Sequence, residues 1–165
     1  MSASLKPLHN AFTRDYKERI GSIKTTCRIS NPFTANFYEG QAIWDTGATR
    51  TVVSPKLVQK LNLIATGRAE VRGVNSRQVV NKYIIGITLP NKLDTRLGAL
   101  ESDIGDKIDI LLGMDVIGIG DFSICNGRVF SFCTPPFIES PIDFVKKADE
   151  VNSSIDKKLK SPKQS

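Results

Sequence analysis

The chain has 165 residues, three cysteines, a single histidine and a formal net charge of +6. This length predicts one domain with tails, and the 40% of hydrophobic residues are enough for a single core. No stretch approaches the roughly 20 apolar residues of a membrane span, and residues 1–8 lack an apolar run of signal-peptide length. We therefore expect a cytoplasmic protein with no membrane partner.

The few cysteines and the single histidine argue against several kinds of site. Cys27, Cys125 and Cys133 form no CxxC pair, so neither a disulfide framework nor a zinc site is favoured, and no cofactor or metal is predicted. Cys125 and Cys133 lie on either side of a predicted hairpin turn and are expected to be buried thiols. His9 lies in a polar stretch, where a fixed Cys–His or Ser–His pair is difficult to build.

Much of the positive charge lies near the C-terminus. A basic tail can bind nucleic acid by neutralising phosphates, but beyond Phe144 no aromatic residue interleaves these lysines, so base stacking is not indicated. A solvated tail is favoured, and nucleic acid is not an expected partner. The lysines are Lys146, Lys147, Lys157, Lys158, Lys160 and Lys163.

Short strands dominate the first half of the predicted structure. Residues 1–15 are expected to form a flexible N-terminal arm. Strand patterns follow over residues 20–29, 37–44 and 51–53. Ser54 and Pro55 then predict the N-cap and first residue of a short helix that ends near residue 62.

The second half continues the pattern of short strands. A hairpin is predicted over residues 70–80, strands over 83–89, 97–100 and 108–113, helical turns over 114–119, and a hairpin over 122–132 with a type I′ turn at Asn126-Gly127. Residues 144–159 are expected to form an amphipathic helix, before a disordered end. This pattern predicts an all-β closed barrel with one or two short helices. Its single domain spans residues 16–138, and a basic, partly helical tail spans residues 139–165.

Asp45 stands at the end of a predicted apolar strand, in the segment Asp45-Thr46-Gly47-Ala48. Two carboxylates in contact cannot both ionise, so such a pair holds an acid and a base that can activate water against a peptide bond. Gly47 lets a second backbone segment approach and exposes its N–H, while Thr46 can donate from its hydroxyl. Asp-Thr-Gly alone is most often an ordinary turn, so its interpretation depends on the segments that accompany it.

Several segments together resemble the retropepsin-like aspartic proteases, and especially their small bacterial members. The resemblance covers about residues 16–135 and includes the final Phe-rich hairpin. The matching segments are Ala42 to Thr49, Thr51 to Ser54 with the helix that follows, Gly73-Val74-Asn75-Ser76 where the family has its flap, and Leu111-Leu112-Gly113-Met114-Asp115 beside the catalytic loop.

The resemblance implies an active site made from two chains. Asp45, Thr46 and Gly47 would be the catalytic segment, and the single Asp-Thr-Gly per chain implies a homodimer. We therefore expect a bacterial aspartic endopeptidase of the retropepsin type that acts on polypeptides. Substrate contacts are expected from Ala48, Gly73, Val74, Asn75 and Ser76, and structural support of the loop from Leu111, Leu112 and Gly113. Asp115 is interpreted as a cap of the short helix.

Two other functions are weighed against this one. The first is a non-catalytic retropepsin-fold module for dimerisation or peptide binding; the intact Asp-Thr-Gly favours the enzyme, because a scaffold gains nothing from a carboxylate buried beside its twin. The second, a basic adaptor, depends only on the charge of the tail.

The arm and the tail exceed the minimal retroviral domain, so the dimer is expected to assemble differently from a retroviral one.

Overall fold

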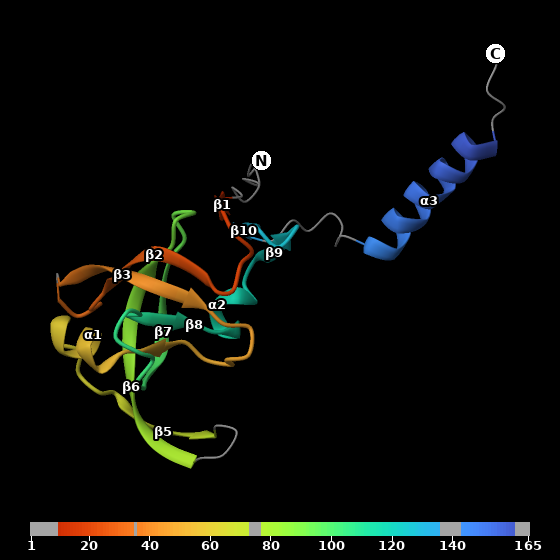
Figure 1. The fold of residues 1–165 in the computed structure, drawn as a ribbon. Coiled ribbons are helices and arrows are strands. Elements are labelled where there is room, and N and C mark those ends of the chain that lie inside the picture. The colour runs from red at the N-terminus through yellow and green to blue at the C-terminus, as the bar shows by residue number, and fades with distance from the viewer. Residues whose placement is uncertain (1–9, 35, 73–76, 136–142, 161–165) are drawn as a thin grey trace, which may run out of the picture.

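The computed structural model describes residues 10–34, 36–72, 77–135 and 143–160. Figure 1 shows a strand-rich body, with helix α3 (Phe144–Lys160) lying away from it. None of the described helices is both long and apolar enough to cross a membrane.

Seven strands form the larger sheet, in the order β2-β3-β8-β4-β7-β6-β5. An additional pairing of β2 with β6 closes all of these strands except β5 into a barrel, and β5 extends from it as the outer strand of a hairpin (Figure 1). The predicted all-β closed barrel is thus confirmed. The strands are β2 (Ile23–Ser30), β3 (Phe37–Trp44), β4 (Val52–Val53), β5 (Gly67–Arg72), β6 (Arg77–Thr88), β7 (Asp94–Glu101) and β8 (Ile110–Leu112).

The short strand β8 lies at the centre of this sheet. It runs parallel to β3 and antiparallel to β4, and Ile110 and Leu112 are fully buried. A short, nearly continuous apolar run is what a strand buried on both faces requires. Because β3 and β8 are parallel and Trp44 pairs with Leu112, the residues that follow the two strands leave the sheet at the same edge.

A smaller antiparallel sheet has the order β1-β10-β9, with β1 (Asn10–Asp15), β9 (Asp121–Cys125) and β10 (Val129–Thr134). The turn between β9 and β10 has φ values of 52° at Asn126 and 64° at Gly127, as the type I′ prediction requires. Strand β1 differs from the flexible arm expected over residues 1–15. Its strand pattern is weak in sequence because Phe12 is its only large apolar residue, yet the Phe12 ring packs 5.5 Å from that of Phe130.

The two short helices of the body are α1 (Pro55–Lys60) and α2 (Met114–Ile117). Ser54 is the N-cap of α1, and its hydroxyl accepts a hydrogen bond from the Leu57 N–H at 3.2 Å, which confirms the sequence prediction. The expected cap role of Asp115 is wrong. Gly113 occupies the N-cap of α2 with no side-chain bond, and the Asp115 carboxylate points instead to Thr51.

An aromatic cluster around Trp44 joins the two sheets. The Trp44 ring lies 4.8 Å from that of Phe132, 5.1 Å from that of Phe130 and 6.1 Å from that of Phe122. Its indole N–H donates to the buried Thr25 hydroxyl at 2.9 Å, so the polar end of the ring is also satisfied. Since Trp44 ends β3, this cluster fixes the strand directly before Asp45.

Candidate active site

Asp45 lies in a tight loop that follows β3. Its backbone N–H donates to the Leu112 carbonyl at 3.0 Å, and its carbonyl accepts from the Ala48 N–H at 3.2 Å. The Gly47 N–H donates to the Asp45 Oδ1 at 2.9 Å. The carboxylate is partly exposed, while Thr46 and Gly47 are exposed. The loop therefore fixes the orientation of one carboxylate at an open surface.

The segment that follows β8 supports this loop from behind. The Met114 N–H donates to the Ala48 carbonyl at 2.8 Å. A Cβ at Gly113 would lie 2.7 Å from both the carbonyl carbon and oxygen of Arg50 and 2.8 Å from the Ala48 oxygen, so only glycine allows this approach. Leu111 pairs with Ile43 on β3 and, on its other side, with β4. The structure thus brings Leu111, Leu112 and Gly113 beside Asp45.

Two hydrogen bonds between Thr51 and Asp115, here called the Thr51–Asp115 clamp, hold the C-terminal end of the loop. The Thr51 N–H donates to the Asp115 Oδ2 at 2.9 Å, and the Thr51 hydroxyl donates to Oδ1 at 2.8 Å. Thr51 is fully buried, and the Gly113 N–H contacts its hydroxyl oxygen at 3.4 Å. Sequence analysis missed this pair, because 64 residues separate its members and neither has a local signal.

A cleft of about 530 Å³ lies between the loop and the hairpin of β5 and β6. Both the loop and the hairpin thus border one open space. Of the expected substrate contacts, Ala48 lines it, whereas Gly73, Val74, Asn75 and Ser76 at the hairpin tip lie outside the described residues. The lining residues are Gly47, Ala48, Thr49, Arg50, Val52, Glu70, Val71 and Leu100, of which sequence analysis identified only the first two.

The Thr46 side chain is exposed beside this cleft. Across the described parts of the chain its hydroxyl forms no hydrogen bond, so it is available to a group from outside the chain. Asp45 is also the sole aspartate that occurs in an Asp-Thr-Gly segment. One chain therefore presents one such carboxylate, next to a hydroxyl that has no hydrogen bond among the described residues.

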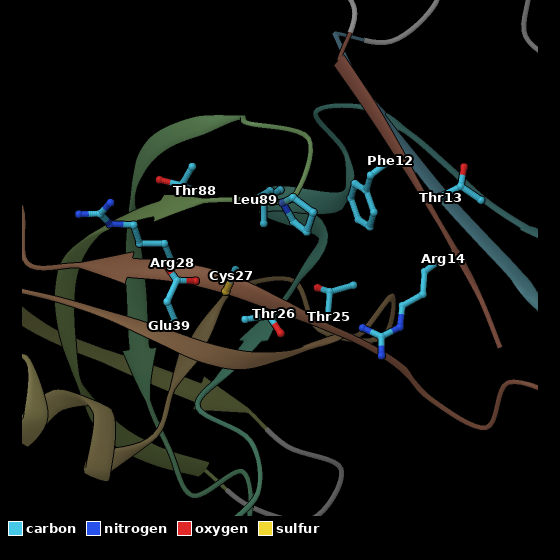
Figure 2. A pocket seen from close by; sticks show the side chains of 11 residues that line it. Phe12, Thr13, Arg14, Thr25, Thr26, Cys27, Arg28, Glu39, Thr88 and Leu89 are labelled. Carbon is cyan, nitrogen blue, oxygen red and sulfur yellow. The ribbon is translucent and has the colours of Figure 1, made fainter. Parts of the chain in front are cut away.

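A second hollow, of about 650 Å³, lies between β1 and β2, and its lining shares no residue with that of the cleft beside the Asp45 loop. Figure 2 shows Phe12 and Arg14 on one side of it and Thr25 and Cys27 on the other. Burial, followed by nearby carboxylates, raises the pKa of Cys27 to about 12, so its sulfur stays a thiol near neutral pH. Among the described residues that line this hollow, Glu39 is the single carboxylate.

The three cysteines differ in exposure. Cys27 and Cys133 are buried, and burial also raises the pKa of Cys133. The expectation of a buried thiol is wrong for Cys125, which is exposed. Cys125 is the last residue of β9, directly before the turn, where the strand leaves the sheet.

Comparison of the chain with known protein families and solved structures agrees with this geometry. A family model described as "Aspartyl protease" matches residues 31–116. A retropepsin-like aspartic protease from Rickettsia conorii has the same fold, with a TM-score of 0.57 and 15% identity over 80% of this chain and 97% of that one.

Two solved structures show lower similarity. EIAV protease with the inhibitor HBY-793 gives a TM-score of 0.45 and 17% identity over 62% of this chain and 88% of that one. The retroviral protease-like domain of Ddi1 from Leishmania major gives 0.43 and 16% over 68% and 95%. No curated protein matches the sequence.

Proposed function

The chain belongs to the aspartyl protease family, whose model spans residues 31–116, and on this premise we propose that it is an aspartic endopeptidase of the retropepsin type. Peptide bonds would be hydrolysed between two Asp45 carboxylates, one from each chain of a homodimer. The observation that carries the proposal is the orientation of a single Asp45 carboxylate by the Gly47 N–H at an open, exposed loop.

The chemistry explains why two chains are needed. Hydrolysis of an amide without a metal requires a base for the attacking water and an acid for the leaving nitrogen. One carboxylate supplies either function at a given moment, whereas two that share a proton supply both. A twofold axis beside the loop would bring the same surface of each chain together and place the second Asp45 opposite the first.

The proposed reaction uses one water held between the two carboxylates. The ionised Asp45 accepts a proton from this water as its oxygen attacks the peptide carbonyl carbon, while the protonated Asp45 donates to the carbonyl oxygen. The resulting diol collapses when the carboxyl that took the proton from water passes it to the nitrogen and the C–N bond breaks. The other carboxylate takes the proton of one diol hydroxyl as the C=O bond re-forms, so the pair again shares one proton. The Gly47 N–H keeps one carboxylate oxygen in place throughout. We assign to the Thr46 hydroxyl a hydrogen bond to the corresponding loop of the partner chain.

The hairpin of β5 and β6 is assigned to cover the peptide. Its strands pair from Gly67↔Lys82 to Arg72↔Arg77, so it extends as one arm over the cleft that the Asp45 loop borders. Such an arm can exclude water and form main-chain hydrogen bonds with an extended substrate. Gly73, Val74, Asn75 and Ser76 at its tip are the proposed substrate contacts.

The decisive experiment is the Asp45→Asn variant, tested beside wild type on a broad peptide library. The amide keeps the size of the side chain but cannot act as a carboxylate base, so we expect cleavage to vanish while circular dichroism and sedimentation stay unchanged. Asp106→Asn, at an exposed aspartate outside the cleft lining, is the matched control and should keep full activity. Cleavage by Asp45→Asn at the wild-type rate would refute the proposal.

The same experiment distinguishes the alternative function. If wild type is a stable dimer with this fold but cleaves no peptide, the chain is a dimerisation or peptide-binding module. A strict monomer at high concentration would remove the two-chain mechanism. Bacterial origin and a cytoplasmic location stay predictions from the sequence.

A further inference from the structure

Arg50 belongs to the Asp45 loop, is exposed, and lines the candidate cleft. The next residue, Thr51, is fully buried, and Val52 is partly exposed and lines the same cleft as Arg50. Arg50 lies in the bend before β4, and Arg50 and Val52 both border the space that a peptide would occupy, while Thr51 between them is buried.

The backbone under Arg50 is held on several sides. A Cβ at Gly113 would lie 2.7 Å from the Arg50 carbonyl, so the two backbone segments are in close contact. The following residue is clamped by both oxygens of Asp115, and the Thr51 carbonyl accepts from the Leu100 N–H at 3.0 Å. A binding residue with a fixed backbone loses less conformational freedom when its side chain engages a ligand.

The Arg50 guanidinium has no ion pair or hydrogen bond with any residue in the described parts of the chain. Glu70, the one carboxylate among the residues that line the cleft, is 3.8 Å from the Arg77 guanidinium. The sequences of β5 and β6 carry four basic residues, Arg68, Arg72, Arg77 and Lys82, against this single acid. The two hairpin strands therefore carry an excess of positive charge, while Arg50 is the single cation among the described residues that line the cleft.

We propose that Arg50 is a specificity-determining residue that selects peptides with Asp or Glu close to the scissile bond. A guanidinium can bind a carboxylate through two parallel hydrogen bonds, which favours an acidic side chain over an amide of the same shape. The apolar Val52, Val71 and Leu100 also line the cleft and can accommodate neighbouring apolar side chains. The inference rests on the proposed function, and a homodimer would place one Arg50 on each side of the scissile bond.

The test uses matched peptides that carry Glu, Gln or Lys at each of the positions flanking the scissile bond. For wild type, we expect kcat/KM for the best Glu peptide to exceed that for its Gln counterpart by roughly fivefold to tenfold, with Lys lowest. High salt should reduce this ratio, because it screens a partly exposed charge pair. Arg50→Gln should abolish the preference, and Arg50→Glu should reverse it towards Lys. Arg96→Gln, at an exposed arginine of β7 outside the cleft lining, should leave it unchanged.

Binding of the same peptides to the Asp45→Asn variant separates this inference from the proposed function. If wild type cleaves peptides without preferring Glu, or if Arg50→Gln keeps the preference, the inference is overturned while the endopeptidase stands. If nothing is cleaved but Asp45→Asn binds the Glu peptides more tightly and loses this selectivity on adding Arg50→Gln, the acidic-peptide site stands without catalysis. If peptides are neither cleaved nor selectively bound, both are wrong.

Discussion

At Gly113, the backbone after β8 touches the backbone of the Asp45 loop, and this close approach is one of the contacts that position the loop. A methyl group there would meet three backbone atoms of Arg50 and Ala48 at 2.7–2.8 Å, and none of them belongs to a flexible side chain. The φ of −91° is ordinary for any residue, so the requirement for glycine is steric.

We predict that Gly113→Ala displaces the loop and strongly lowers peptide cleavage. The free energy of unfolding should fall by about 1–3 kcal/mol, the usual cost of overpacking a closely packed site. Gly21→Ala is the control, because a Cβ at Gly21 would meet nothing within 4 Å. Denaturant titration and kcat/KM of both variants check this. Equal behaviour of the two alanines would show that the approach at Gly113 does not hold the loop.

The cysteines give a second prediction at the residue scale. Cys125 is exposed, whereas Cys27 and Cys133 are buried with raised pKa values, so a thiol-specific reagent should modify one thiol per native chain. All three should react after unfolding. Titration with and without denaturant, followed by peptide mapping, checks the assignment. Rapid native labelling of Cys27 would contradict the buried position of β2.

The residues of the candidate site differ in how far sequence alone could identify them. Asp45 and Gly113 lie in short sequence segments that resemble those of the retropepsin-like proteases, so the sequence alone identified them. Arg50 has no such signal, and its position in a cleft is known only from the three-dimensional arrangement of the loop and β5. The Thr51–Asp115 clamp depends on the pairing of β8 with its neighbours, which no local pattern determines.

At the scale of elements, a polar cluster joins β6 and β7 at the base of the hairpin. The buried Tyr83 donates its hydroxyl proton to the Glu101 Oε2 at 2.8 Å, and the Asn81 amide donates to the same oxygen at 3.0 Å. Burial first, and then the Glu101 carboxylate, raises the pKa of Tyr83 above its usual 10.0. The folded state therefore favours the neutral phenol.

This raised pKa predicts how stability depends on alkaline pH. The contribution of Tyr83 is fully present below its unfolded pKa, near 10.0, and is lost as pH rises through the higher folded value. Tyr83→Phe should cost about 1–2 kcal/mol at neutral pH, since a hydrogen bond to a charged group is removed. The difference between wild type and variant should shrink above pH 10. Urea titrations across pH check this, and a constant difference would contradict it.

Elements with local signals were predicted closely, and those defined by long-range pairing were not. Strand β3, the Ser54 cap of α1 and the Asn126-Gly127 turn follow from strand pattern, capping and turn chemistry. Strand β1 was missed, because its stability comes from pairing with β10, more than a hundred residues away. The sequence predicts the second strand of a hairpin up to residue 80 and a separate strand over residues 83–89. In the structure the two form one strand, β6, because β5 pairs with its first part and β7 with its second part.

At the scale of the whole molecule, β1 already occupies one edge of β10, and β9 occupies the other. A partner chain therefore cannot insert a strand on either side of β10 without displacing a described strand. Within the described sheets, β1 and β9 each have one unpaired edge. The proposed dimer is expected to form around the exposed Asp45 loop, and that it assembles differently from a retroviral one stays a prediction.

The two-carboxylate mechanism makes a prediction that a single-chain enzyme would not meet. We expect hybrids of one wild-type chain and one Asp45→Asn chain to be inactive, because an amide cannot share a proton with the remaining carboxylate. Wild-type and variant chains with different tags can be co-expressed and the hybrid purified through both tags. Hybrids of wild type with the Asp106→Asn control should keep full activity. If the Asp45→Asn hybrid instead cleaves peptides in proportion to its wild-type content, each chain holds a complete site, and the acid that assists Asp45 must come from its own chain.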